Sequence, residues 1–208
     1  CRALGDTASR DGEVLSFQSL ATRVLSQTGG ISDITLDNGG KILIMRRALQ
    51  EVSSYLTVFS KPSQRPAFLR ELVALADELY AYKIAPSLLL QQVQDIPGAA
   101  GDKLRSTALL FGAYDARLHG GDFDARSKVQ KLCDKLPNSD YLCGKDIYID
   151  GFSYFNRTEE DIIAAALKQA NSVTVTLLGD DSDPQLFRNG IQQRERLRRL
   201  AKDAGCSC

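Results

Sequence analysis

The sequence has few of the side chains that usually carry out acid–base or nucleophilic catalysis. It contains one histidine, one methionine and no tryptophan in 208 residues. The histidine, His119, stands in "RLHGGD", after an apolar-periodic segment and before two glycines. A helix is expected to end there, and the negative end of its dipole favours a cation. We therefore interpret His119 as the end of a helix rather than as a catalytic base.

The cysteines do not indicate a disulfide framework. There are five cysteines: Cys1, Cys133, Cys143, Cys206 and Cys208. An odd number in a chain of this length argues against a set of disulfides and favours a reducing cytoplasm. Cys206 and Cys208 could supply half of a metal site. However, no second Cys or His pair stands at ligand spacing, so two free thiols are the more common explanation and no metal is expected.

No apolar run is long enough to span a bilayer, and no signal segment opens the chain, so no membrane partner is expected. Lys and Arg together number 26, as do Asp and Glu. This balance lowers the expectation of a nucleic-acid partner without excluding one, because a groove can be basic on a neutral protein.

Helical periodicity is present through the middle of the chain. Apolar residues recur at steps of three and four from about Lys41 to Leu56, from Pro66 to Lys83, and from Leu104 to Leu118. Pro86 is suited to the first turn of a short helix, and another helix is expected over Ala125–Leu136. Residues 29–143 are therefore predicted to be helical throughout.

Strand patterns occur only outside this block. We predict strands at Glu13–Ser16, Ile147–Asp150 and Val173–Leu177, with helices following each one. Helical crossovers allow all three strands to join one parallel sheet. The predicted fold is α/β. Residues 1–28 and 144–208 form two parts of one core, and residues 29–143 form a large all-helical inserted subdomain.

The strand at Ile147 ends on Asp150, followed by Gly151 and Phe152. A buried strand ending on aspartate is how many nucleotide-hydrolysing proteins hold Mg²⁺, usually with a glutamate next to orient water. With glycine in that place, no adjacent group polarises water. We interpret the motif as a relic; an Asp that merely caps the next turn is the alternative, and it also predicts no hydrolysis.

Three stretches in this order resemble the first half of UvrD-like helicases: "VLSFQSLATRVL", "IYIDGF" and "VTVTLLGDDSDPQLF". The combination is similar to the N-terminal helicase-like region of the B subunits of bacterial AddAB helicase–nucleases, over nearly the whole chain. That family region is an inactivated, incomplete P-loop helicase fold that guides DNA. The resemblance makes Ser16, Phe17, Gln18 and Ser19 candidates for contacting single-stranded DNA. It makes Asp180, Asp181 and Gln185 candidates for sensing nucleotide and DNA.

The sequence departs from the helicase pattern in one further respect: no Gly-x-x-x-x-Gly-Lys-Ser/Thr phosphate loop occurs in it. In the family this loop would precede residue 1, so we expect a fragment. No cofactor is expected in it, although ATP and Mg²⁺ are possible in the full-length protein.

Three functions remain open. The resemblance implies a non-catalytic DNA-handling region of a helicase–nuclease complex, cytoplasmic and active in double-strand break repair and recombination. Its partners would be DNA and the motor and nuclease subunit of a heterodimer. The alternatives are a scaffold for the motor subunit, or an active nucleotide hydrolase in the full-length chain.

Each candidate also has a structural explanation. Phe17 is expected in the core, and Ser16 could cap a helix. For Ser16 and Gln18 a structural role and DNA contact are about equally favoured. For Tyr148, Tyr154 and Phe155, packing is expected rather than base stacking. A basic stripe runs through the last helix: Arg188, Arg194, Arg196, Arg198, Arg199 and Lys202. A solvated helix face is the more common explanation for such a stripe.

Overall fold

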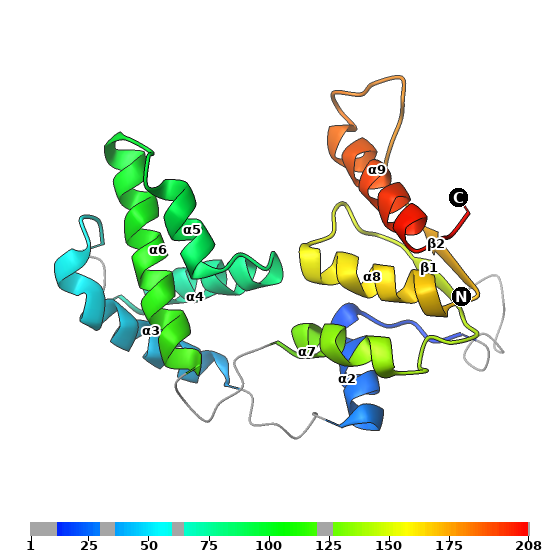
Figure 1. Cartoon of the computed structure of the whole chain (residues 1–208), viewed down its shortest axis with the longest axis horizontal. Coiled ribbons are helices and arrows are strands. Elements are labelled where there is room, and N and C mark those ends of the chain that lie inside the picture. The colour runs from blue at the N-terminus through cyan, green and yellow to red at the C-terminus, as the bar shows by residue number, and fades with distance from the viewer. Residues whose placement is uncertain (1–11, 30–35, 60–64, 120–126, 208) are drawn as a thin grey trace. The chain divides into compact units, whose positions relative to one another are not determined.

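The structure is a computed structural model that describes residues 12–29, 36–59, 65–119 and 127–207 (Figure 1). Helices predominate, and the two strands are short. In chain order the elements are α2 (Phe17–Thr28), α3 (Asn38–Val52), the 3-10 turn η2 (Ser53–Tyr55), α4 (Pro66–Ala81), α5 (Pro86–Val93), α6 (Gly98–His119), α7 (Lys128–Lys135), the 3-10 turn η4 (Leu136–Asn138), β1 (Asp146–Ile149), α8 (Arg157–Gln169), β2 (Ser172–Val175) and α9 (Arg188–Asp203).

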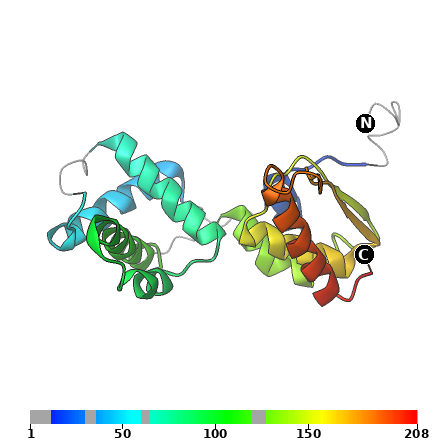
Figure 2. The same cartoon turned by 90° about the horizontal axis from the view of Figure 1, so that it is seen from above.

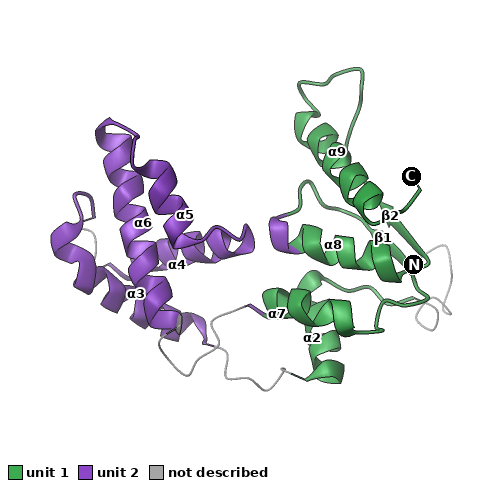
Figure 3. Cartoon of the chain, viewed as in Figure 1, with its two compact units in different colours: residues 1–32, 128–155, 159–208 green, residues 33–127, 156–158 purple. Residues whose placement is uncertain are grey.

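The chain divides into two compact units (Figure 3). Unit 1 comprises residues 1–32, 128–155 and 159–208, and unit 2 comprises residues 33–127 and 156–158. The largest difference from the sequence division is at residues 128–143, which lie in unit 1. α7 was predicted within the helical block, but it belongs to unit 1, where it packs against α2.

Unit 2 is built from α3 to α6. Asp37 caps α3 by accepting a hydrogen bond from the Gly40 amide at 2.7 Å, and α4 and α5 each have a proline in the first turn, where no amide donor is needed. α3 and α5 pack on the long helix α6, and α3 also packs on α4. One apolar cluster forms the core, and its most buried large members are Met45, Leu110 and Tyr114.

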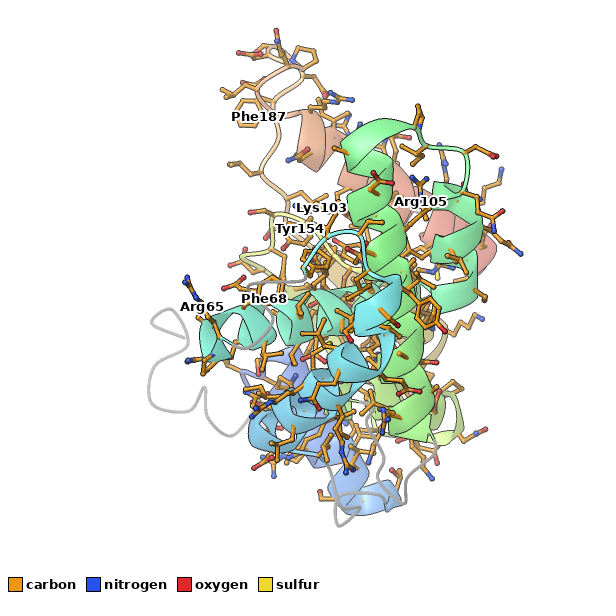
Figure 4. All side chains as sticks on the ribbon, turned by 90° about the vertical axis from the view of Figure 1, so that its left-hand side faces the viewer. Arg65, Phe68, Lys103, Arg105, Tyr154 and Phe187 are labelled. Atoms are coloured by element: carbon orange, nitrogen blue, oxygen red, sulfur yellow. The ribbon has the colours of Figure 1, made fainter. Side chains whose placement is uncertain are left out.

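The corner between α5 and α6 is held by Arg105, which is labelled in Figure 4. Its guanidinium donates to the Ile96 carbonyl at 2.8 Å and pairs with Asp102 at 2.7 Å. Gly101 allows this tight corner, because a Cβ there would lie only 1.8 Å from the Ile96 oxygen.

Unit 1 contains a parallel pair of strands, with Ile147 opposite Val173 and Ile149 opposite Val175. Residues of both strands alternate between exposed and half-buried, and Ile147 and Val173 pack on the apolar cluster of this unit. Its four helices lie on the same side of the strands (Figure 2). The other face of the pair, which carries Tyr148, is open to solvent: Tyr148 is 75% exposed.

The predicted strand at Glu13–Ser16 is wrong. In the described part of the chain the sheet has two strands, β1 and β2, so the expected three-stranded sheet is reduced by one. Ser16 has extended backbone angles, but it uses them to cap α2, and Val14 is 85% exposed with no core to face. The fold is therefore a helix-rich α/β mixture, and the described part of residues 29–143 is helical, as predicted. None of the helices in the described ranges is long and apolar enough to cross a membrane.

Candidate nucleic-acid interface

The first candidate segment, Ser16 to Ser19, forms the start of α2. The Ser16 hydroxyl accepts a hydrogen bond from the Ser19 amide at 3.1 Å, and the two hydroxyl oxygens lie 3.0 Å apart. This is an N-cap, which satisfies an amide that the helix leaves unpaired. The capping interpretation of Ser16 is thus confirmed. Gln18 and Ser19 are exposed on the first turn, and the Gln18 amide group has no hydrogen-bond partner among the described residues.

Phe17 points the other way, into a group of three phenylalanines. Its ring centroid lies 5.3 Å from that of Phe152 and 6.5 Å from that of Phe155, and the latter two rings are 5.1 Å apart. Phe155 is 1% exposed and Phe17 is half-buried. Tilted and edge-on contacts at these distances are favourable pairs of rings. The core interpretation of Phe17 is confirmed, and the cluster fastens the start of α2 to the loop that follows β1.

The second candidate segment lies at the end of β1. Asp150 is exposed and its carboxylate accepts a hydrogen bond from the Thr176 hydroxyl, directly after β2. The Thr176 amide continues the pairing by donating to the Ile149 carbonyl at 3.0 Å. The two residues therefore mark the carboxyl edge of the parallel pair, where open α/β sheets place their ligands.

Gly151 has a backbone conformation that suits glycine. Its φ is +82°, in the region that side-chain-bearing residues rarely adopt, although a Cβ would meet open space. A glutamate in this place would be strained by its own backbone rather than by its neighbours. The backbone conformation at residue 151 therefore disfavours a glutamate next to Asp150, and the sequence has none there.

The described residues do not form a metal site by themselves. No group of three His, Cys, Asp or Glu side chains comes together within the described ranges. Asp150 is a single carboxylate that already accepts from Thr176, and Mg²⁺ bound through nucleotide phosphates needs several further oxygen ligands. These residues therefore do not fit Mg²⁺ or a nucleotide without additional groups.

The third candidate segment follows β2. The Asp180 carboxylate accepts from the Ser182 amide at 2.8 Å, and hydrogen bonds from Ser182 lower the pKa of Asp180. Asp181 pairs with Arg194 of α9 at 3.0 Å, and Gln185 is exposed. Within the described part of the chain, no hydrogen bond or ion pair links these residues to Asp150. The structure thus joins the first two candidate segments and leaves the third apart.

Two aromatic residues behave differently from the sequence expectation. Packing is confirmed for Phe155 but is wrong for Tyr148 and Tyr154, which are 75% and 65% exposed (Tyr154 is labelled in Figure 4). The strand alternation signals the first of these, because Tyr148 falls on the opposite side to Ile147 and Ile149. For Tyr154, which lies in a loop, the sequence carries no such signal.

Sequence analysis also missed Glu160, which is 6% exposed. It accepts from Gln193 at 3.4 Å and lies 3.5 Å from the Arg196 guanidinium, so it ties α8 to α9. In the sequence, a first-turn acid before an apolar helix face indicates only a match to the helix dipole. The pairing with a helix 33 residues away has no local signal.

Comparison with known proteins gives the family. The family model described as "ADDB, N-terminal" matches residues 1–208. The chain belongs to the AddB N-terminal family. Among curated relatives, it is 36% identical over 172 residues to the B subunit of the ATP-dependent helicase/deoxyribonuclease of Desulforamulus reducens, a match that covers 81% of this chain and 15% of the relative.

Two further relatives carry the same name. The protein from Clostridioides difficile is 31% identical over 173 residues, covering 81% of this chain and 15% of the relative. The protein from Bacillus mycoides is 29% identical over 206 residues, covering 92% of this chain and 18% of the relative. This AddB N-terminal chain thus spans less than a fifth of the length of these relatives, and the predicted resemblance is confirmed.

Proposed function

We propose that this chain is a non-catalytic DNA-handling region of a helicase–nuclease complex that acts in double-strand break repair and recombination. The family and the names of its relatives support a role in such a complex. In this proposal the chain is the first part of an incomplete P-loop, UvrD-like helicase core, with the helices α3 to α6 of unit 2 as its helical insertion. Its partners are DNA and the motor and nuclease subunit, and its location is cytoplasmic.

The observation that carries the proposal is the aromatic contact between Phe17 and Phe152. It fixes the first turn of α2 beside the loop after β1, with the exposed Gln18 and Ser19 side chains turned outward. An amide, a hydroxyl and exposed backbone groups can contact phosphate oxygens without reading sequence. DNA held in this way would bind weakly, independently of sequence and with strong salt dependence.

The test is a double substitution, Gln18→Ala with Ser19→Ala, in the complete complex. It removes both side chains and the contact between the Ser16 and Ser19 hydroxyls, but it keeps the cap bond, because that bond uses the Ser19 backbone amide. We expect weaker binding of single-stranded DNA with little change in stability, since exposed polar truncations usually cost less than about 0.5 kcal/mol. Unchanged DNA affinity would contradict the proposal.

Ser16→Ala is the matched control. It removes the cap and should destabilise α2 by about 1 kcal/mol, without removing the outward groups. If DNA binding falls only with Ser16→Ala, the segment is structural. If it falls with the double substitution alone, the segment contacts DNA.

The same geometry argues against nucleotide hydrolysis by these residues. We expect no Mg²⁺-dependent ATP turnover that depends on Asp150, and ATP or Mg²⁺ in the full-length protein would need groups from elsewhere. Gly151→Glu should not create such turnover and should destabilise the loop by about 1 kcal/mol, because it places a side chain at positive φ. Turnover that is lost on Asp150→Ala would favour the hydrolase alternative.

A scaffold for the motor subunit is the second candidate function. It is favoured by two leucines in the segment between β2 and α9, Leu178 and Leu186, which are 77% and 72% exposed. Both leucines come from one segment of the chain, and exposed apolar surface of this kind can mark a protein contact. Loss of subunit association on Leu178→Ser with Leu186→Ser, together with unchanged DNA affinity in the Gln18 and Ser19 variant, would make this the better account.

A further inference from the structure

Positive charge is concentrated on α9. The helix Arg188–Asp203 holds six basic and two acidic residues, whereas the whole chain has 26 of each sign. The sequence alone left open whether this stripe is a solvated face. The structure shows which of these six cations form ion pairs within unit 1 and which do not.

Three of the six cations are used within unit 1. Their carboxylate partners lie between 3.0 and 3.5 Å away: Arg194 pairs with Asp181, Arg196 with Glu160, and Arg198 with Glu195. Glu160 is only 6% exposed, so the ion pair between Arg196 and Glu160 is partly buried and joins α9 to α8. All three cations are therefore paired within unit 1, and only the pair of Arg196 with Glu160 involves a buried carboxylate.

The other three, Arg188, Arg199 and Lys202, are exposed. Within the described residues none of them has an ion pair or a side-chain hydrogen bond. They follow one another at eleven and three residues, which is close to three turns and one turn of a helix, so they share one face over about 21 Å. We call this set of three cations the outer face of α9.

The packing of the helix fixes the direction of this face. Gly190, Gln193 and Ala201 lie on the opposite side of α9, and the last two are 4% and 5% exposed. The backbone at Gly190 is so close to the preceding segment that a Cβ there would lie 1.9 Å from the Leu178 oxygen. Such a close approach holds α9 in one orientation and keeps the outer face in solvent. Phe187, labelled in Figure 4, marks the start of the helix.

Two acids lie near these cations. Glu195 falls on the same face but is 3.2 Å from Arg198 and 3.9 Å from Arg194, so its charge is already balanced. Asp203 is exposed at the end of the helix, beside Lys202. With Glu195 balanced, the outer face keeps a positive excess of about two charges even when Asp203 is counted against it.

We infer that the outer face of α9 binds the phosphate backbone of DNA, as a second contact region separate from the first turn of α2. The inference rests on the proposed DNA-handling function. Unpaired, exposed cations gain most from phosphate, because they give up no existing partner and release condensed counterions from the DNA. Since they are two guanidinium groups and one ammonium on a convex helix face, we expect no sequence preference.

The test is a triple variant of the full-length protein: Arg188→Gln, Arg199→Gln and Lys202→Gln. Its affinity for a single-stranded oligonucleotide is measured over a range of salt concentrations. The expected result is weaker binding at low salt, with the slope of log affinity against log salt reduced by about 2. Helix content should be unchanged, because the three side chains are exposed and form no ion pair or side-chain hydrogen bond with the described residues.

The matched control removes the same charge elsewhere: Arg46→Gln, Arg47→Gln, Lys103→Gln, three exposed cations of unit 2 (Lys103 is labelled in Figure 4). A loss with the α9 variant that clearly exceeds the loss with the control supports the inference. Equal losses would show a general effect of net charge and overturn it. Loss of association with the other subunit while DNA affinity stays unchanged would make the face a protein contact, which also overturns it.

The failures of the two proposals are distinguishable. If the parent protein binds DNA with a steep salt dependence, and only the Gln18 and Ser19 variant weakens it, the α9 inference fails and the proposed function stands. If the parent protein and its complex bind no DNA in the absence of any substitution, the proposed function itself fails, and the α9 inference falls with it.

Discussion

In unit 2 the helices α3, α4 and α6 meet around one apolar cluster, whereas in unit 1 the helix α9 buries only Gln193 and Ala201. Polar contacts in unit 2 supplement the core: Lys41 pairs with Asp77 at 2.7 Å. α9 is attached by polar contacts and by the close approach at Gly190, together with half-buried Ile191, Leu197 and Leu200. The core of unit 2 thus depends on large, fully buried apolar side chains, whereas α9 has no large apolar side chain that is fully buried.

This difference has a consequence for function. Of the six cations on α9, three are paired with carboxylates of unit 1 and three have no ion pair among the described residues. The three unpaired cations are the ones that we infer to bind a polyanion. Substitutions in the apolar core of unit 2 and at the attachment of α9 test this difference between the two units.

The largest effect is expected from Phe111→Ala in unit 2. Phe111 is 3% exposed and packs edge-on against Tyr80, with ring centroids 5.1 Å apart. Removing such a ring from a core costs about 3–5 kcal/mol. Hydrogen exchange should show faster opening of α3, α4 and α6 with α9 little affected, and Leu109→Ala, at a more exposed position of α6, serves as the control. Equal acceleration of exchange in α9 would show that α9 depends on the same apolar core as unit 2.

A smaller loss of stability is expected from Gly190→Ala, although this substitution normally stabilises a helix. Alanine normally stabilises a helix by up to about 1 kcal/mol relative to glycine. Here the added Cβ would meet the Leu178 oxygen at 1.9 Å, so α9 must shift, and we expect a loss of roughly 1–3 kcal/mol. Gly112→Ala in α6 is the control, because its Cβ would lie 3.8 Å from Pro86, an ordinary contact. Thermal unfolding should move in opposite directions for the two variants; a shift in the same direction would contradict this account of α9.

The sequence predicted the elements well, because their signals are local. Apolar periodicity indicated α3, α4 and α6, and the strands at Ile147 and Val173 were placed within two residues of their observed ends. The prediction of a strand at Glu13–Ser16 was wrong, because a short alternation of apolar and polar residues also fits an extended segment that leads into a capped helix. Capping by Ser16 and a core position for Phe17 could be anticipated.

The assembly of the site could not be predicted, because it depends on partners far apart in the chain. Nothing local shows that Phe17 meets Phe152, or that Glu160 meets Gln193. The positive φ of Gly151 is likewise a property of the folded loop. The sequence could therefore name candidate residues of the interface, but only the structure shows which of them lie together.

A third prediction concerns alkaline pH and unit 2. Burial and the hydrogen bond to Asp115, at 2.6 Å, raise the pKa of Tyr80, and burial raises the pKa of Tyr114. Above about pH 10 the unfolded chain ionises these phenols while the folded unit keeps its protons. The stability that these phenols contribute is thus fully present below about pH 10 and is lost as the pH rises. Urea unfolding followed in this unit should show that decline, and it should be shallower in Tyr80→Phe.

The smallest effect is expected from Tyr114→Phe. The Tyr114 side chain is fully buried, and its hydroxyl has no hydrogen-bond partner among the described residues. Removing an unsatisfied buried hydroxyl leaves stability unchanged or raises it by up to about 1 kcal/mol. Tyr80→Phe, which breaks a hydrogen bond, should instead lower stability at neutral pH. A clear loss on Tyr114→Phe would show that the hydroxyl has a partner in solution, and that unit 2 relies on polar contacts more than this comparison allows.

In the proposed function, DNA passes the first turn of α2, where Gln18 is exposed beside the loop after β1. The most direct measurement places a photo-crosslinking side chain at residue 18 of the complete protein in its complex, with a second variant carrying it at the exposed Gln50 of α3. Single-stranded DNA should cross-link from residue 18, and the yield should fall as salt is raised. A complex that binds DNA normally but gives no cross-link from residue 18 above that from residue 50 would contradict the account.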